Sequence, residues 1–334
     1  MQNRRHFLYG GLSTAAAGLA GATALVGARG SRAAEAPPET TTLRFAKFEA
    51  TCLAPLYIVE DLLRDEGFTE VQYVLDNEGD YIARGKVDFG QSFIPLTILP
   101  IDAGKPIVAL AGVHSGCFEV FARESVRGIR DLKGKNVSVR WDADRVVLSM
   151  FAASVGLDPA KDINWIAGER SEKQDLFADG KFDAFLAWPP EAQELHARNV
   201  GHVILNSALD RPWSQYFCCM LHGNADFVLR NPITTKRVVR AIVRATDICA
   251  SKPDWVAQQL VARGFAPQPQ YDYVRQGLAD VPYRKWRDYD AEDSIRFWAL
   301  RLHELGMIKS TPAEIIAKAA DWRFIDEVKR EMGI

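Results

Sequence analysis

The chain reads Leu176-Phe177-Ala178-Asp179-Gly180-Lys181-Phe182-Asp183-Ala184-Phe185 at residues 176–185, and residues 82–89 carry the same pattern as Ile82-Ala83-Arg84-Gly85-Lys86-Val87-Asp88-Phe89. In each copy a helical pattern ends at Gly-Lys, and an apolar residue and an aspartate lead into a run typical of a strand. The copies do not form the short, continuous series that is typical of a solenoid. The repeat therefore predicts two related lobes in tandem.

A second unit also occurs twice. Thr42 to Phe48 is a β-rich run closed by Glu49-Ala50-Thr51, and apolar residues then recur at helical spacing until Gly67. Val137 to Arg140 is another short strand, closed by Trp141-Asp142-Ala143-Asp144 and followed by an apolar helical face that ends at Gly156. Strands that alternate with helices predict an α/β fold, in which each lobe is a mainly parallel sheet with helices on both faces.

Two crossing strands are expected to join the lobes. Phe118 to Ala122 alternates as a strand before a polar turn, and Tyr216 to His222 is the next strand of comparable apolarity. The residues after Asn224 carry only helical patterns, at 234–251, 253–263, 291–305 and 312–332. We therefore assign residues 42–122 and 223–334 to lobe 1, with C-terminal helices that return to cover it, and residues 123–222 to lobe 2.

The first 34 residues have the pattern of an export signal. Arg4 and Arg5 precede an uncharged stretch rich in Ala and Gly, and Ser31-Arg32-Ala33-Ala34 provides small residues for cleavage. A membrane anchor needs about 20 strongly apolar residues, whereas this stretch is only weakly apolar. The pattern predicts a signal peptide at 1–34 and a periplasmic protein exported by the twin-arginine route.

Composition limits the remaining functions. Lys and Arg number 41 against 43 Asp and Glu, so the charge balance indicates no nucleic-acid partner. The six histidines lack metal-ligand spacing, and we expect neither a metal nor another cofactor. An odd number of cysteines argues against a disulfide scaffold, so we expect them to be small buried residues: Cys52, Cys117, Cys218, Cys219 and Cys249.

Three segments are the most specific in the chain, although none is a catalytic motif: Asp131-Leu132-Lys133-Gly134-Lys135-Asn136-Val137, residues 180–190 ending in Leu186-Ala187-Trp188-Pro189-Pro190, and the tail with Trp298-Ala299-Leu300-Arg301-Leu302, Gly306-Met307-Ile308 and Trp322-Arg323-Phe324. Over roughly residues 42–330 the chain resembles the periplasmic substrate-binding proteins of ABC importers, in the group that serves nitrate, alkanesulfonates, taurine and thiamine-precursor pyrimidines. The resemblance implies a type II periplasmic binding protein, a monomeric two-lobed clamp that delivers a small molecule to a membrane permease.

The location of the ligand follows from a general rule. Ligands of open α/β sheets bind beyond the carboxyl ends of the strands, where helix N-termini converge. In the duplicated units this rule selects residues 49–53, 90–93, 141–144 and 188–190. We therefore expect the following ligand-binding residues: Glu49, Thr51, Gln91, Ser92, Phe93, His114, Trp141, Asp142, Asp144, Trp188 and Tyr216.

Aromatic and acidic residues define the expected ligand. Trp141 and Trp188 each follow a strand directly, which predicts two walls that stack on a ring between them. Asp142 lies beside Trp141, and Glu49 occupies the equivalent turn of lobe 1, so both carboxylates favour a ligand that bears donors. Asp144 is also typical of a helix N-cap. The residues predict a small aromatic or heterocyclic molecule with amine or amide donors.

Other interpretations stay open at the level of sequence. Arg140, Arg145 and Arg170 lie near the same loops, and a bidentate guanidinium would suit a small organic anion such as a sulfonate or carboxylate, unless solvent surrounds these side chains. A periplasmic sensor or cofactor carrier would have the same pattern. Fungal thiamine-pyrimidine synthases are related enzymes, but Cys218-Cys219 matches their cysteine-rich segment poorly, and no other catalytic motif is present. The sequence thus predicts a binding protein rather than an enzyme.

Overall fold

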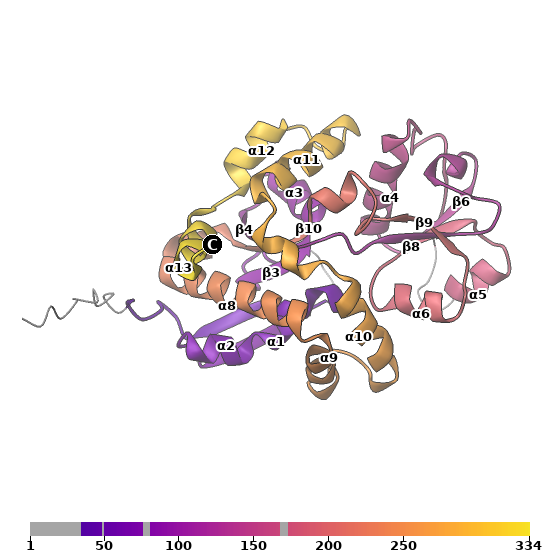
Figure 1. The fold of residues 1–334 in the computed structure, drawn as a ribbon. Helices are drawn as coiled ribbons and strands as arrows, with labels where there is room; N and C mark the ends of the chain where they lie inside the picture. The colour runs from indigo at the N-terminus through magenta and orange to yellow at the C-terminus, as the bar shows by residue number, and fades with distance from the viewer. Residues whose placement is uncertain (1–34, 49, 76–80, 168–172) are drawn as a thin grey trace, which may run out of the picture. The chain divides into compact units, whose positions relative to one another are not determined.

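Two five-stranded sheets organise the chain in the computed structural model, which describes residues 35–48, 50–75, 81–167 and 173–334 (Figure 1). Side chains of residues 173–175 are outside this description, as are the predicted signal peptide, Glu49 and Arg170. Within the described ranges, no helix combines the length and apolarity needed to cross a lipid bilayer.

The first sheet has the strand order β2-β1-β3-β10-β4. Strands β1 and β2 pair in parallel, as do β1 and β3, whereas β10 is antiparallel to both of its neighbours. The pairing of β10 with β3 and β4 brings the late part of the chain into the interior of this sheet. The bounds are β1 Thr42–Ala46, β2 Glu70–Val74, β3 Phe89–Phe93, β4 Ile107–Ser115 and β10 Phe217–Asn224.

The second sheet repeats this arrangement in the order β7-β6-β8-β5-β9. Strand β6 is parallel to β7 and β8, and β5 is antiparallel to β8 and β9. The matching order supports the duplication predicted from the repeated motifs. Four of the five strands in each sheet run in one direction, as expected of a mainly parallel sheet, and the crossing strand, β10 or β5, runs in the opposite direction. The bounds are β5 Glu119–Ala122, β6 Asn136–Val139, β7 Asn164–Ala167, β8 Ala184–Ala187 and β9 His202–Asn206.

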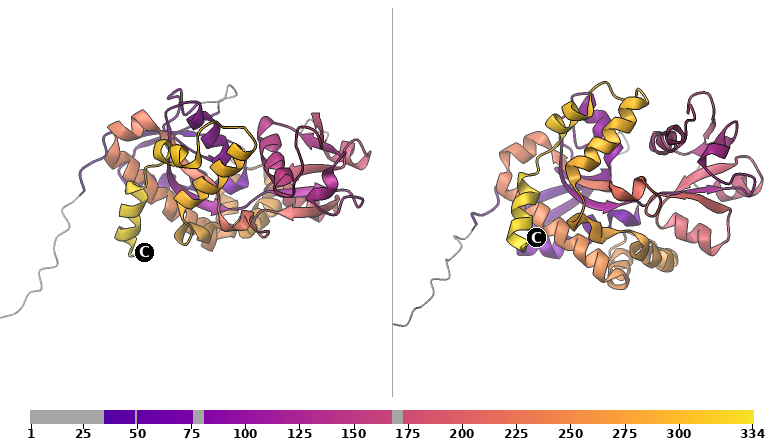
Figure 2. Two further views of the ribbon diagram at one scale, coloured as in Figure 1. Left: turned by 90° about the horizontal axis from the view of Figure 1, so that it is seen from above. Right: turned by 45° about the horizontal axis from the view of Figure 1, so that its top comes forward.

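Helices cover both faces of each sheet, as the sequence predicts. On the first sheet α3, α11 and α12 lie on one face and α1, α2 and α8 on the other (Figures 1 and 2), while α4 lies opposite α5 and α6 on the second sheet. We call these assemblies the first and second lobe. The helices of the first lobe include α1 Ala54–Ile58, α2 Glu60–Asp65, α3 Ile94–Asp102, α7 Ala225–Arg230, α8 Pro232–Ser251, α9 Pro253–Ala262, α10 Tyr271–Asp280, α11 Ala291–Glu304, α12 Pro312–Ala319 and α13 Arg323–Met332.

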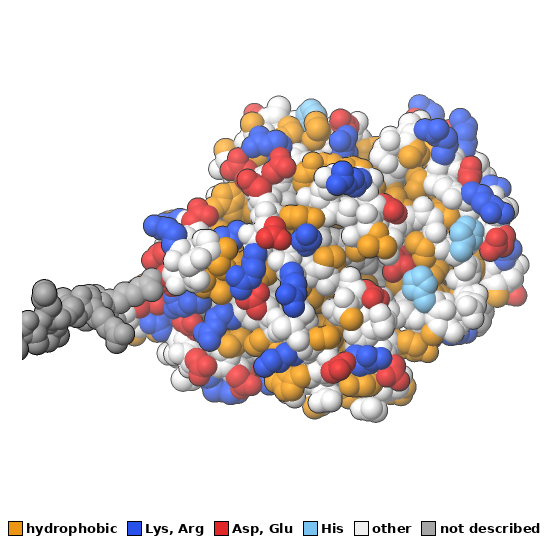
Figure 3. Space-filling model, in the orientation of Figure 1, with side chains coloured by type: hydrophobic (Ala, Val, Ile, Leu, Met, Phe, Trp, Pro, Cys, Tyr) orange, Lys and Arg blue, Asp and Glu red, His pale blue; other side chains and the backbone are white. Residues whose placement is uncertain are grey.

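The described residues of the second lobe form the helices α4 Asp142–Ser154, α5 Lys173–Ala178 and α6 Glu191–Ala197 and the 3-10 turn η2 Ile129–Leu132. The 3-10 turn η3 Trp213–Gln215 lies in the connection between β9 and β10. Further 3-10 turns in the first lobe are η1 Thr51–Leu53, η4 Gln268–Gln270 and η5 Tyr283–Arg287. Figure 3 shows basic and acidic side chains interspersed on the face that it draws, in line with the formal net charge of −2.

Three of the four predicted C-terminal patterns fold largely as predicted, and α7 and α10 are helices outside the predicted ranges. Helix α8 begins at Pro232, whose fixed φ and missing N–H suit a first helical turn, and it buries Val238, Ile242 and Ala245 at helical spacing. The pattern predicted as one helix at 312–332 is two helices. Ala320 forms a parallel bridge with Ala109 of β4, and this extended residue separates α12 from α13.

The connections between the lobes lie slightly earlier in the chain than the sequence suggests. Strand β5 belongs to the second sheet and β10 to the first, so each strand has already entered the lobe that follows the crossing. The first crossing is therefore at residues 116–118, between β4 and β5, and the second is at residues 207–216, between β9 and β10. The two crossings meet at Ser207, whose hydroxyl and amide bond to the backbone of Phe118.

A buried histidine in β10 predicts an acid-sensitive fold. Burial lowers the pKa of His222 to about 4, whereas an unfolded histidine titrates near 6.5. As the pH falls, the unfolded chain therefore binds a proton at a higher pH than the folded chain does. His222 does not change the free energy of unfolding above about pH 6.5, and it lowers this free energy as the pH falls from about 6.5 toward 4. We expect a contribution of about 2 kcal/mol lost between pH 7 and pH 5.

Urea unfolding at pH 7, 6 and 5 measures this loss. A His222→Gln variant should show a flatter dependence on pH, and His303→Gln provides a control because His303 is exposed on α11. Equal slopes for the wild type and His222→Gln would contradict the assignment to His222.

Candidate functional site

A cavity of about 140 Å³ lies at the carboxyl ends of strands from both sheets. The first lobe contributes residues after β1 and at the end of β3, and the second lobe contributes the start of α4 and the end of β8. These are the four loops that the strand-end rule selects, so the structure brings them together around one cavity. The lining residues are Phe48, Ala50, Cys52, Leu53, Tyr81, Gln91, Ser92, Phe93, Leu96, Cys117, Phe118, Trp141, Ala143, Asp144, Val147, Leu186, Trp188 and Cys219.

Aromatic rings form much of the wall, but they do not form the predicted sandwich in this structure. The ring centroids of Trp141 and Trp188 are 5.7 Å apart, whereas a ring inserted between two others needs about 7 Å, twice the contact distance of carbon atoms. The two tryptophans therefore contact each other. Phe48 packs edge-on against Trp141 with a centroid distance of 5.6 Å, so the aromatic contact spans both lobes.

The lobes also contact each other through hydrogen bonds. The backbone N–H of Thr51 donates to the carbonyl oxygen of Pro189 over 3.2 Å. The side-chain amide of Gln193 donates to the carboxylate of Asp280 over 3.0 Å. With the contact between Phe48 and Trp141, these bonds hold the cavity between joined lobes.

Arg140 is buried behind the tryptophans rather than solvated or free to hold an anion. Its side chain is 2% exposed and forms ion pairs with Asp144, over 3.3 Å, and Glu191, over 3.0 Å. The guanidinium carbon lies 4.2 Å from the ring centroid of Trp188, within the range of a cation–π contact. One guanidinium thus faces two carboxylates beside the cavity. Arg145 is exposed, with its guanidinium over the ring of Trp165.

Two buried acceptor oxygens in lining residues have no partner among the described residues. One carboxylate oxygen of Asp144, Oδ2, accepts from the backbone N–H of Arg140 over 2.9 Å, and Oδ1 has no partner. The amide nitrogen of Gln91 donates to the carbonyl of Cys52 over 3.1 Å, which leaves Oε1 without one. A buried acceptor without a donor costs about 1–3 kcal/mol. Both oxygens belong to residues that line the cavity.

Some of the predicted ligand-binding residues line the cavity and others do not. Gln91, Ser92, Phe93, Trp141, Asp144 and Trp188 line the cavity. Thr51 and His114 are buried outside the lining, Asp142 is exposed at the start of α4, and Glu49 lies outside the described residues. Tyr216 stacks on Phe297 with a centroid distance of 3.9 Å, so its ring packs against α11 instead of the cavity. Asp144 lies in the first turn of α4 rather than at its N-cap, and its carboxylate accepts a hydrogen bond from the backbone N–H of Arg140. The N-cap residue is Trp141, which forms no side-chain capping bond.

Several lining residues are not predicted from the sequence. Phe48 follows β1 as Trp141 follows β6, and this equivalence is a signal that could have identified it. Phe118 and Cys117 lie in the first crossing, and Cys52 and Cys219 resemble ordinary core residues in sequence. All five cysteines are buried, as expected, and the structure contains them as free thiols.

Comparison with known proteins identifies the family. The sequence model described as NMT1/THI5 like matches residues 70–255, more than half of the chain, so the protein belongs to the NMT1/THI5-like family. The two lobes have the fold of periplasmic binding proteins, as the resemblance found in the sequence implies. A comparison with curated proteins found no significant match.

Solved structures share the fold at low sequence identity. The periplasmic nitrate-binding protein NrtA from Synechocystis PCC 6803 is 17% identical, with a TM-score of 0.75 over 89% of this chain and 90% of that chain. The alkanesulfonate-binding protein SsuA from Xanthomonas axonopodis pv. citri, bound to MOPS, is 15% identical, with a TM-score of 0.67 over 85% and 99%. The desulfurization enzyme DSZB is 16% identical, with a TM-score of 0.58 over 88% and 100%.

Proposed function

We propose that the protein is a periplasmic solute-binding receptor that captures a small, donor-bearing molecule between its lobes and delivers it to the permease of an ABC importer. Membership of the NMT1/THI5-like family and the likeness to NrtA and SsuA, which bind nitrate and alkanesulfonates, support the receptor role. The predicted twin-arginine signal at residues 1–34 would direct the protein to the periplasm. The protein would act as a monomer.

The polarity of the cavity carries the proposal for the ligand. Among the described lining residues there is one carboxylate, Asp144, and no lysine or arginine. The unpartnered oxygens of Asp144 and Gln91 need donors, which an amine, amide or amino-substituted ring supplies. A sulfonate or nitrate would bring only acceptor oxygens to these groups. The aromatic rings of the wall suit a planar ligand, provided that Trp141 moves away from Trp188 to admit it.

The chemistry of the lining favours binding over catalysis. The carboxylate of Asp144 is ion-paired with Arg140, so it is held as a fixed acceptor. The hydroxyl of Ser92 lies 3.0 Å from the hydroxyl of Thr97 and is therefore paired with another neutral group rather than with a base. The alternatives of a periplasmic sensor or cofactor carrier would use the same cavity and differ in the partner.

The receptor proposal is tested by identifying the ligand and then removing the acceptor. Mass spectrometry of small molecules released from the purified protein should find a donor-bearing compound, and adding that compound should raise the melting temperature. Asp144→Asn places an amide where the ligand needs an acceptor, and we expect calorimetry to show affinity about 10- to 100-fold weaker, as for a hydrogen bond to a charged group. Asp158→Asn is the control, because Asp158 is a partly exposed carboxylate in the same lobe.

Binding of an anion instead of a donor-bearing compound would contradict the proposed ligand. Stabilisation by nitrate or an alkanesulfonate, together with unchanged or stronger anion binding by Asp144→Asn, would contradict the donor-bearing ligand and support the anion alternative. Melting curves without ligand separate these effects from a loss of stability, because Asp144 also pairs with Arg140.

A further inference from the structure

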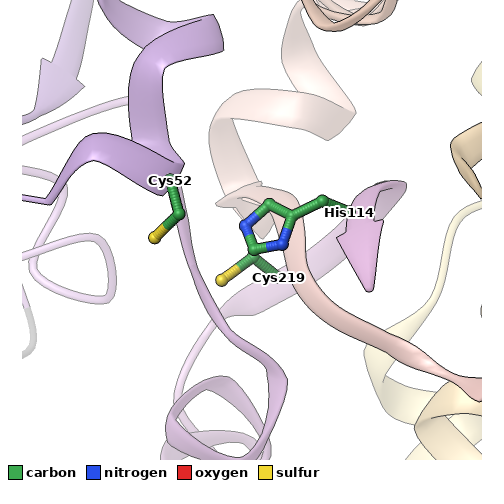
Figure 4. A group of neighbouring side chains, drawn as sticks. All are labelled: Cys52, His114 and Cys219. Atoms are coloured by element: carbon green, nitrogen blue, oxygen red, sulfur yellow. The ribbon is translucent and has the colours of Figure 1, made fainter. Parts of the chain in front are cut away.

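Four of the five cysteines gather around one histidine at the junction of the two crossings. Cys52 lies in η1, His114 in β4, Cys117 in the first crossing, and Cys218 and Cys219 near the start of β10. All five side chains are buried. Figure 4 shows Cys52, His114 and Cys219 side by side, although they come from three separate elements of the first lobe. The fold thus concentrates sulfur and nitrogen donors that are far apart in the sequence.

The spacing of the donors suits a single ion. The donor atoms of Cys52, His114 and Cys219 lie within 4.8 Å of one another, and so do those of His114, Cys117 and Cys218. The sulfur of Cys218 is 3.6 Å from that of Cys117 and 3.9 Å from that of Cys219. Two sulfurs bound at 2.3 Å to one trigonal or tetrahedral ion lie about 3.8–4.0 Å apart. Small movements of these side chains would therefore complete a coordination shell.

His114 is already oriented as a ligand. Its Nδ1 lies 2.9 Å from the carbonyl oxygen of Ser115, which fixes Nδ1 as the protonated nitrogen and leaves a lone pair on Nε2. Nε2 is buried and has no hydrogen-bond partner among the described residues, and the ring as a whole is 0% exposed. Metal-binding histidines commonly donate their other N–H to a backbone carbonyl in this way. The free nitrogen is a second observation, independent of the cysteines, that indicates a bound ion.

We propose that Cys52, His114, Cys117, Cys218 and Cys219 provide a site for one thiophilic d10 ion, Cu(I) or Zn(II). Several sulfurs and one imidazole select such soft or borderline ions over Mg²⁺ or Ca²⁺, which prefer oxygen. Each of the two donor groups offers one nitrogen and two sulfurs, a three-coordinate set that favours Cu(I), whereas Zn(II) would recruit a fourth donor from the cluster.

The proposed site adjoins the cavity between the lobes and the two connections that join them. Cys52, Cys117 and Cys219 also line the cavity between the lobes, so an ion can reach the cluster from there. Bound to Cys117 and to either cysteine of β10, the ion would link the first crossing to the strand that follows the second. The inference concerns these residues alone and does not depend on which molecule the receptor imports.

Titration of the purified full-length protein with Cu(I), without oxygen and against a competing chelator, tests the site; a parallel titration uses Zn(II). We expect one ion per chain, a higher melting temperature and, for Cu(I), new ultraviolet absorption from thiolate-to-metal charge transfer. Cys219→Ser and His114→Gln should each weaken binding by at least about 100-fold. Cys249→Ser is the matched control, because Cys249 is equally buried but lies in α8 outside the cluster.

X-ray absorption of the metal-loaded wild type keeps the test independent of variants that fold poorly. Sulfur and nitrogen neighbours at about 2.0–2.3 Å would support the site, and a shell of oxygen alone would overturn it. Failure to bind either ion, or equal binding by Cys219→Ser and Cys249→Ser, would also overturn it. A disulfide between Cys117 and Cys218 in the protein as purified, seen as the loss of two hydrogens in mass, would show instead that the cluster is a redox pair.

Discussion

Arg140→Met should lower the free energy of unfolding by about 3–5 kcal/mol, because it removes the cation from a buried group of charges. Arg140 is 2% exposed, and its partners Asp144 and Glu191 are also largely buried. Methionine fills a similar volume, so the loss should come mainly from removing the guanidinium that faces two largely buried carboxylates. Urea unfolding at pH 7 measures the difference.

Two further variants isolate the cause. Arg296→Met removes an exposed pair with Glu292 on α11 and should cost no more than about 0.5 kcal/mol. Adding Glu191→Leu to Arg140→Met should recover part of the loss, because one of the two buried carboxylates that face Arg140 is then absent. A loss for Arg140→Met no greater than that for Arg296→Met would mean that water reaches the buried group.

Gly116→Ala should cost about 3 kcal/mol, because there is no room for a side chain where the two crossings meet. A β-carbon at Gly116 would overlap the carbonyl group of Ser207 and the backbone nitrogen of Ala208. These are backbone atoms, so rotation of a side chain cannot relieve the overlap and the crossings must separate. Thermal and urea unfolding of the variant measure the cost.

Gly128→Ala is the matched control for this prediction. A β-carbon at Gly128 meets nothing within 4 Å, and its change in stability should stay within about 0.5 kcal/mol. If Gly116→Ala were as stable as Gly128→Ala, the close approach of the crossings at Ser207 would not describe the protein in solution.

The parts of the fold that are visible in the sequence are those determined by local pattern. Gly180-Lys181 and Gly85-Lys86 end helical patterns in both lobes, and alternation of strands and helices reveals the duplicated units. The position of β10 between β3 and β4 is not local, since it pairs residues more than 100 positions apart. The one antiparallel strand of each sheet, β10 or β5, could therefore not be placed from periodicity.

The same distinction applies to the site. Trp141 and Trp188 follow strands directly, so the strand-end rule places them at the cavity, and the structure agrees. The burial of Arg140 depends on Glu191, about 50 residues later, and a charged side chain beside a loop gives no sign of this partner. The cysteines are missed for another reason: small buried cysteines have the same pattern in sequence whether they fill a core or gather around a histidine.

The place of β10 in the first sheet also determines the order in which the lobes can be completed during synthesis. The last strand of the second sheet ends at Asn206, whereas the first sheet needs Phe217–Asn224 between β3 and β4. The ribosome therefore releases every strand of the inserted lobe while the surrounding one still has a gap at its centre. Until β10 is synthesised, the edges of β3 and β4 that will pair with it stay unpaired. Unpaired strand edges can pair with other chains, so we expect the risk of aggregation to be greatest during this part of translation.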